Sequence, residues 1–130
     1  MDALLYTKLV TILSALMLIW FALKVGGARG KHEIKAPSVS GPDEFNRVYR
    51  AHQNTVEMMV VFLPTLWVFS SLVNDLYAGI LGIIWILGRV LYFFAYCKEA
   101  SKRARGFLIS FLALMVMIIW SLVNMVGLLI

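Results

Sequence analysis

Four runs of apolar residues, each close to the length of a membrane-spanning helix, constrain this chain more than any other feature. They cover residues 4–25, 58–73, 78–96 and 107–130. A bilayer core of about 30 Å needs about 20 helical residues, since each adds about 1.5 Å. The hydrophobic content of 62% is higher, and the charged content of 15% is lower, than in a typical soluble domain. We therefore predict an all-α integral membrane protein, a bundle of four transmembrane helices.

Polar residues beside these runs set the expected helix bounds. Pro42, Asp43 and Glu44 suit the first turn of a helix, so the second helix should begin well before its apolar run. The first run is too long for a signal peptide and no small-residue cleavage site follows it, so we expect it to be retained. The expected helices cover residues 4–25, 43–73, 78–97 and 107–130, in one domain over residues 1–130.

Basic residues gather in two of the three expected loops. The first loop, made irregular by glycines and prolines, has Lys24, Arg29, Lys31, Lys35, Arg47 and Arg50 in or beside it, and the third has Lys98, Lys102, Arg103 and Arg105. The second, around residues 74–75, has none. The positive-inside rule then places loops one and three in the cytoplasm and both termini outside.

Several function classes are disfavoured by the sequence. The net charge of +5 comes from basic residues that gather in two loops, as the topology of a membrane protein explains, so we expect no nucleic-acid partner. The single Cys97 excludes an intrachain disulfide and a cysteine-rich zinc site, so no metal is expected. A small transporter has little support, because neither a broken helix pair nor an inverted repeat is visible.

The start of the second helix has a polar stripe. At 100° per residue, Asn54 falls about 40° from Arg50 and Glu57 about −20° from it, while His52 points roughly the other way. An arginine can bind a carboxylate through two hydrogen bonds, and a glutamate can accept an ammonium. The stripe therefore suits a small zwitterionic ligand.

A second stripe lies on the third helix, where Arg89, Tyr92 and Tyr96 fall within about 60° of one another. Arg103 would join them if that helix continued past Cys97. Two simpler interpretations stay open: Glu57 could form a structural ion pair with Arg50 or Arg89, and the tyrosines could belong to an interfacial aromatic belt.

Three strings, GPDEFNRVYRAHQNTVE, FLPTLW and GRVLYFFAYCKEASKRARG, resemble the MAPEG family, membrane-associated proteins in eicosanoid and glutathione metabolism. The likeness covers most of the chain and is closest to bacterial microsomal glutathione transferases. It implies a homotrimer of four-helix subunits that bind glutathione between neighbouring subunits at the cytoplasmic side. A bacterial inner membrane is expected, since the chain is compact and has no C-terminal retrieval signal.

The same resemblance implies roles for individual residues. Glutathione binding would fall to Arg29 in the first loop and to Arg50, His52, Asn54, Glu57, Tyr92 and Tyr96. Arg103 would be the catalytic cation that stabilises the glutathione thiolate, because the thiolate is the nucleophile and a free thiol has a pKa of about 8.5. The thiolate would attack a hydrophobic electrophile from the membrane or reduce a lipid hydroperoxide.

Two positions depart from the family pattern. Met58 stands where many relatives have a tyrosine, which puts one ligand contact in doubt, and Gly30 follows Arg29 where leukotriene-forming members have a second arginine. Some family members bind lipid without catalysis. A non-catalytic lipid-binding scaffold is therefore the alternative to a glutathione transferase.

Overall fold

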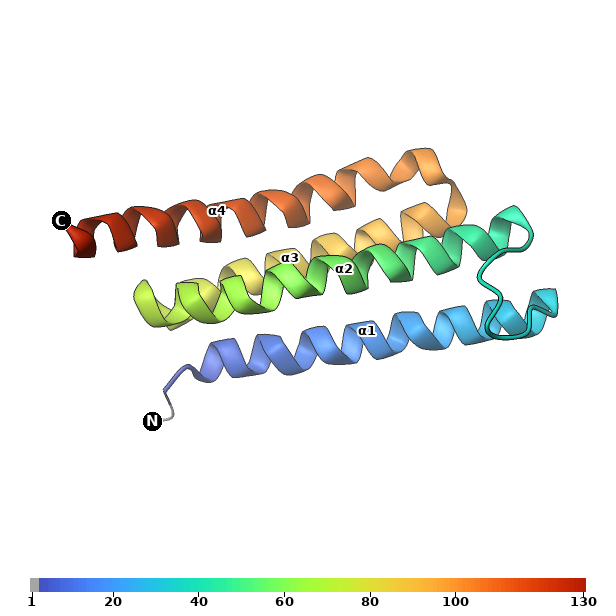
Figure 1. The fold of residues 1–130 in the computed structure, drawn as a ribbon, viewed down its shortest axis with the longest axis horizontal. Coiled ribbons are helices and arrows are strands. Elements are labelled where there is room, and N and C mark those ends of the chain that lie inside the picture. Colours follow the sequence, from blue (N-terminus) through green and yellow to red (C-terminus); the bar gives the residue numbers. More distant parts are fainter. Residues whose placement is uncertain (1–2) are drawn as a thin grey trace.

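The structure, a computed structural model, describes residues 3–130, and its architecture is an antiparallel bundle of four long helices (Figure 1). These are α1 (Leu5–His32), α2 (Asp43–Leu72), α3 (Asp75–Lys98) and α4 (Ala104–Leu129), with a short 3₁₀ turn, η1 (Ala100–Arg103), before α4. All four helices are long and apolar enough to cross a membrane. Helix α1 packs on α2 and α3, whereas α4 packs mainly on α3.

The two ends of the bundle differ in their connections (Figure 1). The α1–α2 loop, residues 33–42, and η1 lie at one end. The short α2–α3 connection and the C-terminus lie at the other end. The two basic loops identified in the sequence therefore share one end of the molecule.

Helix α1 is longer than the sequence analysis predicted, and the expected end at residue 25 is wrong. Gly26, Gly27 and Gly30 are helical, and α1 ends where Glu33 adopts a left-handed conformation and donates its backbone N–H to the Arg29 carbonyl. A glycine costs a helix only about 1 kcal/mol. Basic side chains in the last turn interact favourably with the helix dipole and help to offset that cost.

The other helices differ from the expected ranges by one to three residues at their ends. Helix α2 ends at Leu72, one residue early, and continues through Pro64. Helix α3 starts three residues early, at Asp75, because the Asn74 side chain accepts a hydrogen bond from the Tyr77 N–H and caps it. Residues 1 and 2 of the expected domain lie outside the described residues.

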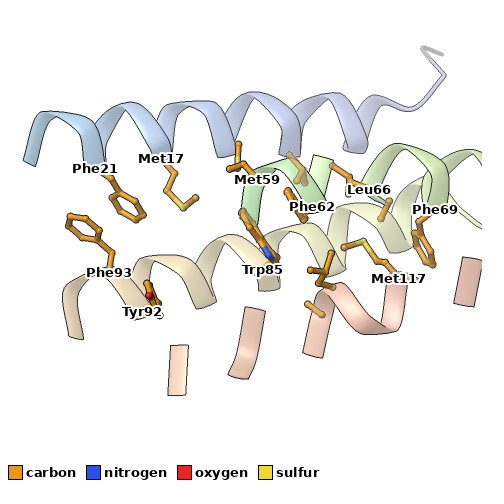
Figure 2. Packing of buried hydrophobic residues seen from close by; sticks show 14 of the residues in the cluster. Met17, Phe21, Met59, Phe62, Leu66, Phe69, Trp85, Tyr92, Phe93 and Met117 are labelled. Carbon is orange, nitrogen blue, oxygen red and sulfur yellow. The ribbon is translucent and has the colours of Figure 1, made fainter. Parts of the chain in front are cut away.

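Stacked aromatic rings fill the interior of the bundle (Figure 2). Phe21 of α1 stacks on Phe93 of α3 with ring centroids 4.0 Å apart, and Phe62 of α2 stacks on Trp85 of α3 at 3.8 Å. All four side chains are almost fully buried. Helix α3 thus contributes to both stacks and is the centre of the packing.

The outside of the bundle carries many large apolar side chains. Leu23 is 70% exposed and Val60 is 72% exposed, and large hydrophobic side chains are exposed on all four helices. A soluble protein does not present so much apolar surface to water, but a lipid environment makes it favourable. The chain is therefore an integral, multi-pass membrane protein.

Two glycines let α3 and α4 approach closely beside the polar end of the bundle. A Cβ atom added to Gly106 would lie 2.5 Å from Tyr92 Cα and 2.7 Å from the Gly88 carbonyl oxygen. One added to Gly88 would lie 2.7 Å from the Ser110 backbone nitrogen. Small residues permit such backbone contact between membrane helices. The crossing fixes the start of α4, and with it η1, against Tyr92.

Candidate functional site

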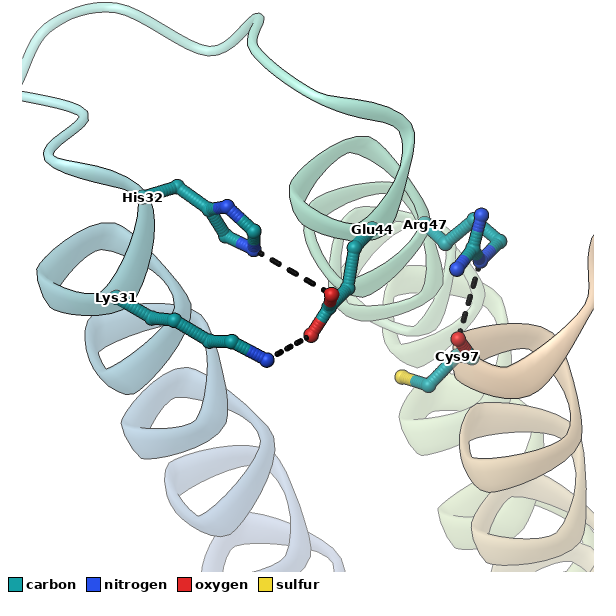
Figure 3. A network of polar contacts seen from close by, with 5 residues as sticks. All are labelled: Lys31, His32, Glu44, Arg47 and Cys97. Atoms are coloured by element: carbon teal, nitrogen blue, oxygen red, sulfur yellow. Dashed lines mark hydrogen bonds and ion pairs between the residues drawn. The ribbon is translucent and has the colours of Figure 1, made fainter.

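Polar contacts hold the loop end of the bundle together (Figure 3). Lys31 Nζ lies 2.7 Å from Glu44 Oε1 and joins the end of α1 to the start of α2, with His32 Nε2 3.8 Å from the same carboxylate. Arg47 Nε donates to the Cys97 carbonyl at 3.0 Å and joins α2 to the end of α3. These contacts set the spacing of the helices that carry the candidate site.

One cleft opens between the start of α2 and the end of α3, and we call it the Arg50 cleft. Its volume is about 330 Å³, and it is lined by Asp43, Asn46, Arg47, Arg50, Tyr96, Lys98, Glu99 and Ala100. Arg50 is exposed, and within residues 3–130 no carboxylate lies within salt-bridge distance of it. Arg50 and Tyr96, which belong to different predicted stripes, therefore line the same cleft.

A second cleft lies between α2, α3 and the η1–α4 corner, and we call it the Arg103 cleft. Its volume is about 570 Å³, and it is lined by Asn54, Tyr92, Ser101, Arg103, Ala104 and Phe107. Three of the sequence-predicted residues, Asn54, Tyr92 and Arg103, thus come together here. Within one chain, the two clefts together contain five of the eight predicted site residues.

Arg103 reaches this cleft by a different route from the one considered in the sequence analysis. Helix α3 ends at Lys98, so Arg103 does not continue its stripe but sits at the end of η1. Its guanidinium still lies over the Tyr96 ring, 5.5 Å from the centroid, and Nη1 donates to the Ala100 carbonyl at 2.6 Å. Among the residues described, no carboxylate pairs with Arg103. Its positive charge is available to an anion in the cleft.

Arg89 lies behind the wall of the Arg103 cleft. It is fully buried, its Nη2 donates to Asn54 Oδ1 and to Thr55 Oγ1 at 2.8 Å each, and its guanidinium lies 4.0 Å from the Tyr92 ring centroid. A buried cation within a membrane bundle is a functional candidate by default. The sequence placed Arg89 on the correct stripe, but the α2 partner it suggested was Glu57, whereas the structure pairs Arg89 with Asn54 and Thr55.

Glu57, His52 and Arg29 lie apart from both clefts in the single chain. Glu57 is exposed, and within residues 3–130 it forms no ion pair, so the suggested pairs with Arg50 and Arg89 are absent. His52 is half-buried. Arg29 is helical rather than in a loop, donates to the Ser38 carbonyl at 2.7 Å and lies over the Phe45 ring.

Two kinds of site residue were not predicted from the sequence. Arg47 was counted among the basic residues in or beside the first loop, because its role in holding the end of α3 has no local signal. Ser101 and Phe107 line the Arg103 cleft only because η1 turns the chain back across α3. Within residues 3–130, no group of three His, Cys, Asp or Glu side chains could hold a metal ion.

Comparison with known proteins identifies the family of this chain. The profile of the MAPEG family matches residues 7–123, which is most of the chain. The chain belongs to the MAPEG family. It is 46% identical to microsomal glutathione S-transferase 2 of Homo sapiens over 101 residues, which are 78% of this chain and 69% of that protein.

Two further MAPEG relatives extend the comparison. An uncharacterized protein of Synechocystis sp. is 36% identical over 121 residues, which are 93% of this chain and 88% of that protein. Leukotriene C4 synthase of Rattus norvegicus is 38% identical over 119 residues, which are 92% of this chain and 76% of that protein. By their names, two of these three relatives are a glutathione transferase and a leukotriene-forming enzyme.

Proposed function

We propose that this MAPEG protein is a membrane-bound glutathione transferase that conjugates the glutathione thiolate to hydrophobic electrophiles. The observation that carries the proposal is the Arg103 cleft, in which a guanidinium with no carboxylate partner among residues 3–130, the Asn54 amide and Tyr92 line one space. The similarity to microsomal glutathione S-transferase 2 supports glutathione as the co-substrate.

The proposed chemistry depends on the charge of Arg103. Only the thiolate form of glutathione is a strong nucleophile, and a neighbouring cation lowers the thiol pKa and raises the thiolate fraction at neutral pH. Each pKa unit corresponds to about 1.4 kcal/mol of differential stabilisation. An arginine stays protonated at neutral pH, so the stabilising charge is always present. No separate base is needed, because the thiol proton leaves to water.

Glutathione would be held by the two clefts and by the residues between them. Arginines such as Arg50 bind carboxylates through two hydrogen bonds, while Glu57 accepts an ammonium. Tyr96 faces both arginines, since it lines the Arg50 cleft and lies beneath Arg103. Arg29, His52, Asn54 and Tyr92 complete the proposed set.

A homotrimer would explain why the proposed set is incomplete in one chain. Glu57 and Arg50 are exposed and have no ion pair within residues 3–130, and His52 and Arg29 line neither cleft. We propose that glutathione binds between subunits, with loops one and three in the cytoplasm of a bacterium and the helices in its inner membrane. The shared end of the two basic loops supports this orientation.

The apolar exterior would let a hydrophobic electrophile reach the site from the bilayer. A hydrophobic electrophile dissolved in the bilayer meets lipid-exposed Phe107 at the edge of the Arg103 cleft. The same thiolate would also attack a lipid hydroperoxide and release the lipid alcohol, and a second glutathione would then yield glutathione disulfide and water; we include this reduction as a second activity of the one site. A non-catalytic lipid-binding scaffold is the competing function, and it would not require an unpaired cation in the cleft.

Purified protein in detergent tests the proposal. We expect saturable glutathione binding and glutathione-dependent conjugation of 1-chloro-2,4-dinitrobenzene, and reduction of a fatty-acid hydroperoxide tests the second activity. R103A should lower the conjugation rate while glutathione still binds, whereas K102A, which removes a neighbouring charge in η1, should keep the rate. Absence of binding and turnover in the wild type would favour the scaffold, and an unchanged rate in R103A would place the catalytic cation elsewhere.

A further inference from the structure

The buried guanidinium of Arg89 has its strongest contacts with α2. Nη2 donates to Asn54 Oδ1 and Thr55 Oγ1, both at 2.8 Å. The Thr55 hydroxyl proton is already donated to the Ala51 carbonyl at 3.0 Å, so its oxygen is free to accept from Arg89. Both acceptors on α2 are therefore matched to a group that can only donate.

This contact determines which end of the Asn54 amide faces Arg89. A guanidinium carries five N–H donors and no acceptor, so the atom of Asn54 that faces Nη2 must be the oxygen. The amide nitrogen, with two N–H groups, then occupies the other side of the same planar group. Asn54 also lines the Arg103 cleft, and these N–H groups are the donors that its amide has left for a ligand.

Arg89 also supports the second wall of the cleft. Its guanidinium lies over the Tyr92 ring, 4.0 Å from the centroid. Tyr92 is almost fully buried, and it lines the Arg103 cleft. Arg89 itself lines neither cleft. It therefore contacts two lining residues from behind and does not reach the space in which a ligand would bind.

We propose that Arg89 is a positioning residue that fixes the Asn54 amide as a hydrogen-bond donor to a carboxylate or peptide-carbonyl oxygen of glutathione. With the Arg103 guanidinium in the same cleft, the walls then present donors and favour ligand groups that accept hydrogen bonds. The inference rests on the proposed glutathione site. It makes Arg89 a determinant of specificity that never touches the ligand.

A double-mutant cycle on the full chain in detergent tests the proposal, with glutathione affinity measured by calorimetry. R89M replaces the cation by an apolar side chain of similar length, which releases the Asn54 amide. Ordering a free side chain on binding costs enough to weaken affinity about threefold to tenfold. In an N54A background, R89M should change affinity by less than about twofold, because the group through which Arg89 acts is gone.

Two further variants separate positioning from a structural role. T55V removes the other acceptor of Arg89 Nη2 without altering either cleft lining, so it should lower the unfolding temperature and leave glutathione affinity within about twofold. R89K keeps a donor and a charge and should recover part of the affinity lost in R89M.

The outcomes distinguish this proposal from the function on which it rests. Equal losses from R89M with and without N54A, or a loss in T55V as large as in R89M, would overturn the positioning role while glutathione binding stands. Failure of the wild type to bind glutathione would overturn the proposed function itself, and the positioning role with it.

Discussion

Substitution of Gly106 by alanine tests whether the α3–α4 crossing holds the candidate site in place. The new Cβ would lie 2.5 Å from Tyr92 Cα and 2.7 Å from the Gly88 carbonyl oxygen, and it would also meet the Tyr92 backbone nitrogen. Carbon atoms in contact are normally about 3.5–4.0 Å apart. Because the opposing atoms are backbone, no side chain can rotate away, and α4 must move by about 1 Å.

The expected magnitude follows from two opposing terms. Overpacking a close contact costs about 1–3 kcal/mol, and the rigid backbone on both sides favours the upper part of that range. Alanine improves helix propensity by about 1 kcal/mol over glycine. We therefore expect G106A to destabilise the chain by about 2 kcal/mol. Since η1 leads directly into α4, a shift of about 1 Å at Arg103 should also lower the conjugation rate by up to about 100-fold.

The assay compares unfolding temperature and conjugation rate of G106A with those of G127A. Gly127 lies on the same helix, and a Cβ there would meet nothing within 4 Å, so G127A should be neutral or slightly stabilising and fully active. If G106A matched G127A in both measurements, the crossing would not be as close as the structure shows, and the placement of Arg103 by α4 would be refuted.

Three other predictions concern helix ends and the thiolate. Asp75 caps the start of α1, since it accepts hydrogen bonds from the Tyr6 N–H, the Thr7 N–H and the Thr7 hydroxyl. D75A should therefore lower stability by about 1–2 kcal/mol in thermal unfolding, and a loss no larger than in D43A would contradict this capping role. Glu33 ends α1 at φ 54°, so E33G should stabilise by about 1 kcal/mol; lower stability would contradict the left-handed cap. R103A should shift the pH–rate profile upward by about one unit or more, because loss of a cation raises the glutathione thiol pKa; an unshifted profile would refute thiolate stabilisation by Arg103.

The sequence predicted the membrane bundle because apolar length and composition report directly on the solvent of a helix. It predicted the end of α1 poorly, since local glycine content was given more weight than the contacts that extend the helix. Arg29 and Lys31 are joined to Ser38 and Glu44 across the loop, and such tertiary contacts have no signature in a single stretch of sequence.

The candidate site was predictable as two stripes, but its division into two clefts was not. Helical periodicity correctly grouped Arg89 with Tyr92 and Tyr96 as one face of α3. It could not show that η1 would bring Arg103 back over Tyr96, because a turn outside the helix has no helical phase. Nor could it show that Arg89 would select Asn54 and Thr55 as its partners rather than Glu57.

The glycine crossing has a consequence for how this fold can be altered. Because Gly88 and Gly106 bring two backbones into direct contact, the position of Arg103 depends on main-chain atoms rather than on the identity of the neighbouring lipid-facing side chains. Exposed positions further along α4, such as Leu112 and Ile119, can therefore change size without moving the cation. Libraries that vary these positions should therefore preserve the proposed activation of glutathione by Arg103.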